Sequence, residues 1–244
     1  MTDKKSLLAP LLLLLLTDCS SPQEKAQRIV KQAMEEHGVK VLKKDSVRFT
    51  FRDHRYTHFR NDGNFYYAKT PLEKGKGRRD LLTNKGFSRY KDGQLVELSK
   101  PDSVASAQSL NSVIYFAFLP YRLNDKAVIK EYAGTEKIKG IPYHRVRVSF
   151  KKRGGGADHE DLFLYWFRKK DARMDFFAYR YFRDEGGVRF RAAFDARKVE
   201  GLLIQSYKNY KGSKGTALKK LDERWARGEL EKVSEIRTEN VTVQ

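Results

Sequence analysis

The chain has 244 residues, of which 40% are hydrophobic and 33% charged, and its formal net charge is +19 at pH 7. A single cysteine excludes an intrachain disulfide. The 15 Phe, 13 Tyr and 2 Trp residues are enough for a sizeable core. The excess of Lys and Arg favours anionic partners such as phosphate, acidic lipid, acidic glycan or nucleic acid, and it does not distinguish among them.

The N-terminal segment has the pattern of an export signal. Lys4 and Lys5 precede an apolar run at residues 7–16, and Cys19 follows directly. A helix of this length spans about 15 Å, half of the roughly 30 Å bilayer core, and is too short for a transmembrane helix. Residues 16–19, Leu-Thr-Asp-Cys, resemble the lipobox of bacterial lipoproteins, in which the cysteine is acylated and becomes the first mature residue. Asp18 departs from the Gly, Ala or Ser of that pattern, and an ordinary signal peptide is the alternative.

From this resemblance we expect a lipoprotein signal peptide at residues 1–18 and a single domain at residues 19–244. Lipid attachment at Cys19 would make the membrane a partner and place the protein in the cell envelope. The pattern does not say whether it faces the outer membrane or the periplasm. A lipidated, strongly basic protein would be held at an anionic membrane by both acyl burial and charge.

Helices and strands follow in a clear order. Ser21, Pro22 and Glu24 form a capping box that begins a helix over residues 22–37, and Gly38 ends it. Alternating apolar residues then predict strands at 47–52, 56–60, 64–68, 86–90 and 94–98. Residues 102–119 predict a helix that is apolar nearly all round and therefore buried against the sheet.

The second half of the chain is predicted to be a meander of strands. They lie at 127–132, 143–150, 162–167, 176–182, 188–194 and 202–210, before a short helix near 218–228 and closing strands within 233–243. The strand at 162–167 is apolar on both faces, as a central strand covered on two sides should be. In strand 188–194 alternation places Val188, Phe190, Ala192 and Phe194 inward and Arg189 and Arg191 outward.

Consecutive hairpins favour an antiparallel sheet over alternating strand–helix units. The predicted class is α+β, with a curved antiparallel sheet, an open half-barrel, wrapped around the buried helix at 102–119.

The densest polar cluster is the turn before strand 162–167. Asp158, His159 and Asp161 could act as a general acid–base group in an envelope hydrolase. Adjacent strand residues point to opposite faces, so the cluster cannot converge on one ion, and Phe163 excludes the HExxH zinc pattern. A hydrophilic turn is the simpler interpretation, and we expect neither a metal nor a cofactor.

Several motifs resemble a family of uncharacterised lipoproteins from Bacteroidetes-type bacteria. The motifs are residues 111–120 with 123–125, 154–161 with Tyr165-Trp166, 189–191 and 207–210. The candidate ligand-binding residues, all taken from these motifs, are Asn111, Tyr115, Asn124, Asp125, Tyr165, Trp166, Arg189, Arg191 and Asn209.

A shorter segment, residues 132–140 followed by Tyr143, is distantly similar to periplasmic lipoprotein carriers and outer-membrane lipoprotein receptors. That similarity implies an open half-barrel with an apolar cavity for acyl chains. The functional hypothesis is a non-enzymatic, lipid-anchored binder of an apolar, acyl or anionic ligand, and no nucleic acid is expected. The alternatives are the hydrolase and a structural or assembly lipoprotein that docks through its basic face.

Overall fold

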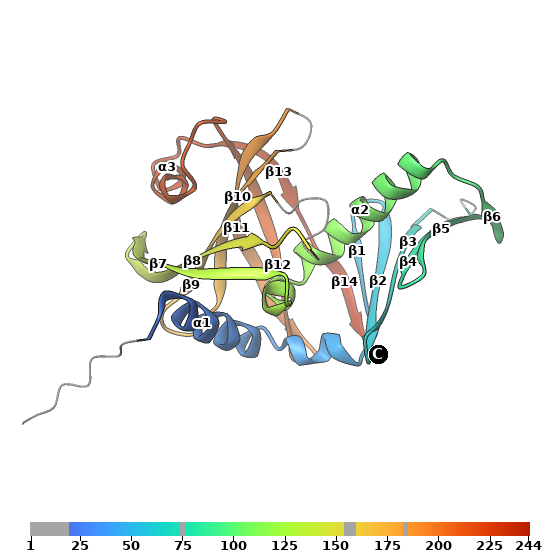
Figure 1. Ribbon diagram of the computed structural model, residues 1–244, viewed down its shortest axis with the longest axis horizontal. Coiled ribbons are helices and arrows are strands. Elements are labelled where there is room, and N and C mark those ends of the chain that lie inside the picture. Colours follow the sequence, from blue (N-terminus) through green and yellow to red (C-terminus); the bar gives the residue numbers. More distant parts are fainter. Residues whose placement is uncertain (1–19, 74–76, 154–159, 183–184) are drawn as a thin grey trace, which may run out of the picture.

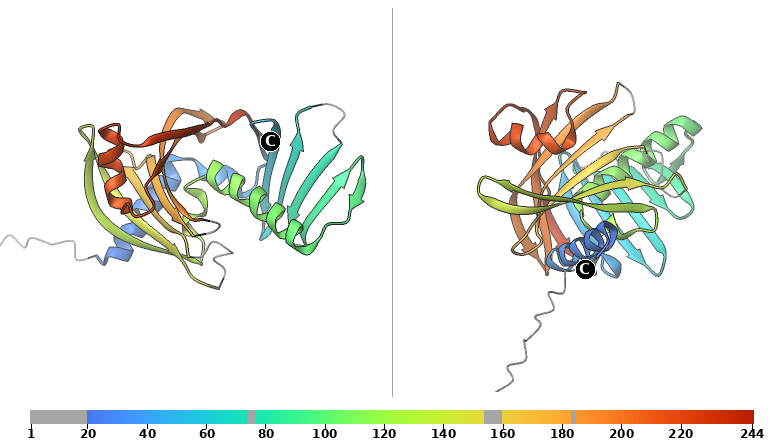
Figure 2. Two further views of the ribbon diagram at one scale, coloured as in Figure 1. Left: turned by 90° about the horizontal axis from the view of Figure 1, so that it is seen from above. Right: turned by 60° about the vertical axis from the view of Figure 1, so that its left-hand side comes forward.

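The computed structural model describes residues 20–73, 77–153, 160–182 and 185–244. These residues form two antiparallel sheets, which lie beside each other with the helix α2 (Lys100–Ala117) between them (Figures 1 and 2). The predicted curved antiparallel wall around a helix is confirmed, and the wall consists of two open sheets. Among the described helices, none has both the length and the apolar character that a membrane span requires.

Sheet A is built mainly from the first half of the chain. It contains β1 (Val47–Phe51), β2 (His54–Asn61), β3 (Asn64–Pro71), β4 (Arg78–Thr83), β5 (Gly86–Lys91), β6 (Gln94–Val96) and β14 (Glu239–Val243), in the order β14-β1-β2-β3-β4-β5-β6. Its inner face packs against α2 through Phe49, Tyr56 and Tyr67. Its outer face carries Arg48, Arg55 and Arg79 around an open hollow, as expected for the polar face of an antiparallel sheet.

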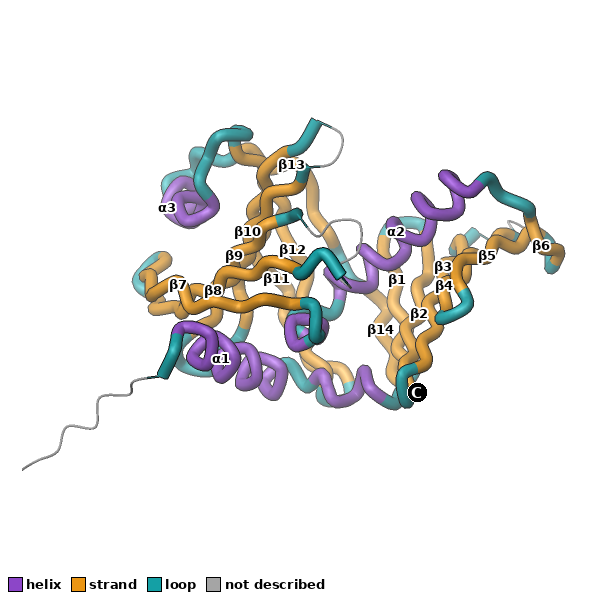
Figure 3. The backbone as a smooth tube through the Cα atoms, viewed as in Figure 1, coloured by secondary structure: helices purple, strands orange, loops and turns teal. Residues whose placement is uncertain are grey.

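Sheet B is built from the second half of the chain. It contains β7 (Val128–Ile138), β8 (Ile141–Phe150), β9 (Leu162–Arg168), β10 (Met174–Tyr181), β11 (Gly187–Val199), β12 (Leu202–Gly212) and β13 (Glu231–Ile236), in the order β13-β12-β11-β10-β9-β8-β7. The short step from β13 to β14 carries the chain from sheet B into sheet A (Figure 3).

Both faces of sheet B are covered, which explains why β9 is apolar throughout. Phe163, Tyr165 and Phe167 face the core shared with α1 (Pro22–Glu36), whereas Leu164 and Trp166 face the opposite side, covered by η3 (Leu218–Lys220) and α3 (Leu221–Ala226). The prediction of a doubly covered central strand is therefore confirmed.

The helix α1 begins with the predicted capping box: the Ser21 hydroxyl accepts from the Glu24 backbone, and the Glu24 carboxylate accepts from the Ser21 backbone. After it the chain turns at Gly38, whose φ of +64° is left-handed. A side chain there would collide with the Gly201 carbonyl oxygen, so glycine lets the helix end lie against the start of β12. The short helices η1 (Val39–Lys43) and η2 (Tyr121–Asn124) complete the fold.

Two sequence predictions about burial are wrong. The N-terminal half of α2 is largely open to solvent, with Val104 48% exposed, because only its C-terminal half lies between the sheets (Figure 2). Arg191 does not face solvent but is 8% exposed on the face of sheet B that meets α2. Val188, Phe190 and Ala192 are buried on the other face, under α3. The predicted alternation in β11 is present, but helices cover both faces of the strand.

Candidate functional site

The helix α2 joins the two hydrophobic cores because its two sides meet different sheets. Ser99 begins the helix by accepting a hydrogen bond from the Asp102 backbone. Leu110 and Ile114 belong to the core of sheet A. Tyr115 and Phe116, one and two positions further on, pack against the core of sheet B. The helix therefore holds the sheets apart along part of its length.

The space that results is a cleft of about 240 Å³, here called the α2 cleft. Its lining residues come from α2, from the inner strands of both sheets and from the β13–β14 junction: Phe49, Phe51, Ser109, Ser112, Val113, Phe116, Ala117, Arg191, Tyr207, Ile236 and Thr238. The lining is mostly apolar, with a few hydroxyl groups. Arg191 is the one charged residue among these described residues.

Arg191 is held by aromatic side chains. Its guanidinium carbon lies 4.4 Å from the centre of the Phe116 ring, 5.3 Å from that of Phe177 and 5.4 Å from that of Tyr179. Its Nη2 donates to the Tyr179 hydroxyl at 3.1 Å, and its Nε is buried without an acceptor. Within the described part of the chain, no carboxylate forms an ion pair with this guanidinium. The arginine thus brings an uncompensated positive charge to an apolar cleft.

Three predicted candidates, Asn209, Tyr115 and Tyr165, lie on the same side of sheet B as Arg191. Asn209 is its direct partner across β12, and the Asn209 Oδ1 is buried without a hydrogen-bond donor. Tyr115 and Tyr165 approach each other at 3.5 Å between their hydroxyl oxygens. Burial raises the pKa of Tyr115 to about 12 and that of Tyr165 further, so both phenols are neutral near pH 7.

Other candidates lie elsewhere. Trp166 points to the opposite face, where its Nε1 donates to Asp222 at 3.3 Å. Asn124 accepts from Gln27, Asp125 pairs with Arg122, and Arg189 donates to the Val188 carbonyl. The sequence motifs therefore combine residues from the cleft with residues that have structural partners outside it. Ser112, Phe116 and Tyr207 also line the cleft, and the sequence analysis did not single them out, although all three belong to the quoted motifs.

Of the Asp158, His159 and Asp161 cluster, only Asp161 lies within the described residues. It is 8% exposed, and its Oδ1 accepts a hydrogen bond from the Phe182 backbone at 3.3 Å, which ties the start of β9 to the end of β10. Cys19 also lies outside the described residues. No group of three or more potential metal ligands gathers in the described ranges.

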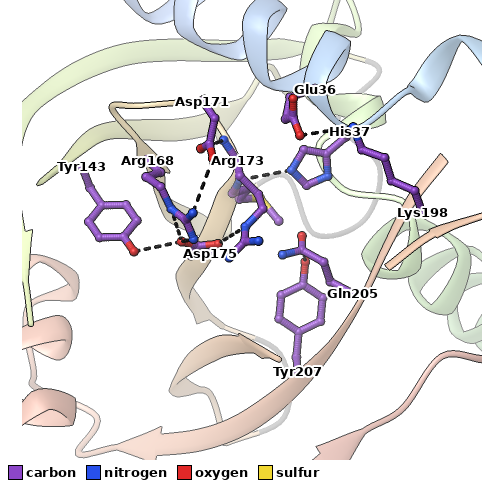
Figure 4. A network of polar contacts seen from close by, with 11 residues as sticks. Glu36, His37, Tyr143, Arg168, Asp171, Arg173, Asp175, Lys198, Gln205 and Tyr207 are labelled. Carbon is purple, nitrogen blue, oxygen red and sulfur yellow. Dashed lines mark hydrogen bonds and ion pairs between the residues drawn. The ribbon is translucent and has the colours of Figure 1, made fainter. Parts of the chain in front are cut away.

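A polar network lies near the cleft residue Tyr207 (Figure 4). Asp175 is buried and accepts hydrogen bonds from the Tyr143 hydroxyl at 2.9 Å, from Arg168 at 2.7 and 3.0 Å, and from Arg173 at 2.7 Å. Each of the two arginines therefore has a carboxylate partner, unlike Arg191. This contrast indicates that the network has a structural role, whereas the charge in the cleft lacks its counterpart.

A family model described as a family of unknown function, DUF6503, matches residues 4–238. The chain belongs to this family. The resemblance to an uncharacterised family is thereby confirmed, and DUF6503 itself supplies no activity. No match was found among curated proteins.

Three solved structures are similar to this DUF6503 chain, and the one with a TM-score above 0.5, the first below, shares its fold. A DUF1329 family protein from Desulfovibrio piger is 14% identical with a TM-score of 0.54, covering 79% of this chain and 87% of that chain. A LolA superfamily protein from Nitrosomonas europaea is 12% identical, with a TM-score of 0.48 and coverage of 90% and 91%. A Vibrio parahaemolyticus protein described as an outer membrane lipoprotein-sorting protein domain is 10% identical, with a TM-score of 0.48 and coverage of 90% and 93%.

Proposed function

We propose that the protein is a non-enzymatic binder of an amphipathic ligand. The apolar part of the ligand would occupy the α2 cleft, and an anionic group would pair with Arg191. The observation that carries the proposal is the buried guanidinium at the wall of this apolar cleft, without a carboxylate partner among the described residues.

The free energy of a buried charge supports this proposal. Removing an ion from water without a counterion costs several kcal/mol, and a single phenol oxygen with aromatic rings offsets only part of it. A carboxylate or phosphate would provide charge-assisted hydrogen bonds to the guanidinium. The cleft volume of about 240 Å³ is near the lower end of small-molecule sites, so we expect a single slender hydrocarbon chain.

Decanoate and decanol provide a direct test, because they share a chain and differ in charge. We expect the protein to bind decanoate, measured by displacement of a fluorescent fatty acid. Replacing Arg191 by Met keeps much of the side-chain volume and removes the charge. Arg191→Met should weaken decanoate binding about tenfold or more, an effect of about 1.4 kcal/mol, and leave decanol binding unchanged.

Arg189→Met is the matched control. Arg189 lies two residues away on β11, does not line the cleft and donates to the Val188 carbonyl. Its replacement should leave decanoate affinity unchanged. Equal decanoate affinities for wild type and Arg191→Met, or no binding of either ligand, would contradict the proposal.

We also propose that the protein is anchored in the cell envelope by a lipid on Cys19. The lipobox-like segment supports this, as does the start of α1 at Pro22, three residues after the cysteine. Such a short connection would keep the domain close to the membrane surface. Metabolic labelling with an alkyne fatty acid should mark the wild type and not Cys19→Ser, and the variant should leave the membrane fraction. Equal labelling of both would contradict the anchor.

A further inference from the structure

A second hollow lies on the face of sheet B that is turned away from α2. Its volume is about 300 Å³, and we call it the η3 pocket. Its lining residues are Ala133, Arg145, Arg147, Leu162, Phe163, Leu164, Arg180, Ala217, Leu218 and Lys219. The α2 cleft shares none of these residues, so the two hollows are separate.

Strand register gathers the cations of the η3 pocket. Arg147 pairs with Leu164 across β8 and β9, and Arg180 pairs with Leu162 across β9 and β10. Directly paired residues point to the same face of a sheet, so arginines from two strands flank a leucine floor. Arg145 lies two residues before Arg147 and shares that face.

The roof of the pocket is the segment after β12. The Thr216 carbonyl accepts from Arg180 Nη2 at 3.0 Å, and the Thr216 hydroxyl accepts from Arg224 at 3.1 Å. Leu218 packs against the hydrophobic core beneath α3. These contacts fix the roof above β9 and β10.

The pocket carries more positive than negative charge. Two of its arginines form ion pairs: Arg145 Nη1 lies 3.5 Å from Glu136 Oε2, and Arg147 Nη1 lies 3.1 Å from Glu131 Oε2. Arg180 and Lys219 form no ion pair with a carboxylate in the described ranges. The Nε atoms of Arg145 and Arg180 are buried without acceptors among the described residues. Two positive charges therefore remain beside an apolar floor.

We infer that the η3 pocket is a second ligand site, selective for a small organic anion in which a carboxylate or phosphate is attached to a compact apolar group. The apolar group would rest on Leu162 and Leu164, and the anionic group would pair with Arg180 and Lys219. Leu162 supports this orientation, because it is 38% exposed and so offers apolar surface at the mouth.

The dye 8-anilinonaphthalene-1-sulfonate tests the inference, because it joins a sulfonate to an aromatic body. When the dye is titrated into the full chain, its fluorescence should reveal a binding site. Arg180→Met should weaken dye binding at this site at least tenfold, and Arg191→Met should leave it unchanged. Lys219 is exposed, so the Lys219→Met variant should fold normally. Its affinity for the dye at the same site should be about threefold weaker. Arg227→Met is the control, since Arg227 pairs with Glu229 outside the pocket, and it should have no effect.

Benzoate and phenyl phosphate, added as competitors, identify the anionic group. Displacement of the dye from the Arg180-dependent site by either competitor supports the inference. The competitor that displaces it at the lower concentration shows whether the site prefers a carboxylate or a phosphate. Displacement by neither overturns it, as does unchanged dye affinity in both Arg180→Met and Lys219→Met. This experiment can fail without affecting the proposal for the α2 cleft, and the reverse also holds. The dye test depends on Arg180 and Lys219, which do not line that cleft, whereas the decanoate test depends on Arg191.

Discussion

The guanidinium carbon of Arg191 on β11 lies 4.4 Å from the centre of the Phe116 ring on α2. This contact connects sheet B to the helix that separates the two sheets, and it places a positive charge against an aromatic face. Cation–π contacts of this kind are worth about 1–2 kcal/mol when desolvated, less than an ion of this type loses on burial. We therefore expect Arg191 to lower the free energy of unfolding, compared with an apolar side chain of similar shape at this position.

Arg191→Met tests this directly in the absence of ligand. Because a buried charge without a counterion is destabilising, we expect the variant to unfold at a higher temperature than the wild type. A gain of about 1 kcal/mol would raise Tm by about 2–4 °C in a chain of this size. Calorimetry of both proteins measures it. A large fall in Tm would mean that Arg191 is needed for packing.

Phe118 should be among the most important residues for stability. It is 4% exposed and packs edge-on against Phe49 and His58, with ring centres 5.4 and 5.1 Å apart. Phe118→Ala should lower the free energy of unfolding by about 3–5 kcal/mol, because it leaves a cavity between α2 and sheet A. Phe182→Ala is the control, since Phe182 is 51% exposed, and should change it by less than about 1 kcal/mol. Urea titration measures both.

Asp175→Asn should destabilise the protein by about 3 kcal/mol, because two arginines and a tyrosine donate to this buried carboxylate. Tyr143→Phe removes one hydrogen bond and should lower the free energy of unfolding by about 1 kcal/mol. Asp195 forms a partly exposed pair with Arg197, and Asp195→Asn should have an effect below about 1 kcal/mol. Similar losses for Asp175→Asn and Asp195→Asn would show that the network contributes little.

Stability should fall below neutral pH because of two buried histidines. Burial lowers the pKa of His37 and of His58 to about 3, and for His58 the nearby Arg60 and Arg122 act in the same direction. The unfolded chain takes up these protons near pH 6.5 and the folded chain does not, so stability is lost as pH falls from about 6.5 to 3. Each histidine contributes up to about 1.4 kcal/mol per pH unit in that window.

His58→Phe isolates one of these contributions. His58 is stacked on Tyr67 at 5.2 Å, and both of its ring nitrogens are buried without partners, so Phe suits the site. Between pH 6 and pH 4 the free energy of unfolding, measured in urea, should decrease less steeply in the variant than in the wild type. Parallel curves would show that His58 is protonated in the folded protein.

Local pattern alone predicts much of this fold. The capping box at Ser21 and Glu24 specifies the start of α1, and the alternation in residues 143–150 and 162–167 specifies two strands that pair as β8 and β9. These features depend on neighbours a few residues apart, and their periods of 3.6 and 2 are visible in the sequence.

Tertiary structure decides which side of each strand is interior. Strand β11 alternates apolar residues with Arg189 and Arg191, and such alternation normally means one buried and one solvated face. Here α3 covers the apolar face and α2 covers the other, so Arg191 is buried by elements that lie distant in the sequence. Whether a strand face is buried depends on which elements pack against it. The alternation of residues along the strand does not reveal which elements those are. The charge in the α2 cleft and the cluster of arginines in the η3 pocket exist only because strands and helices from separate parts of the chain come together.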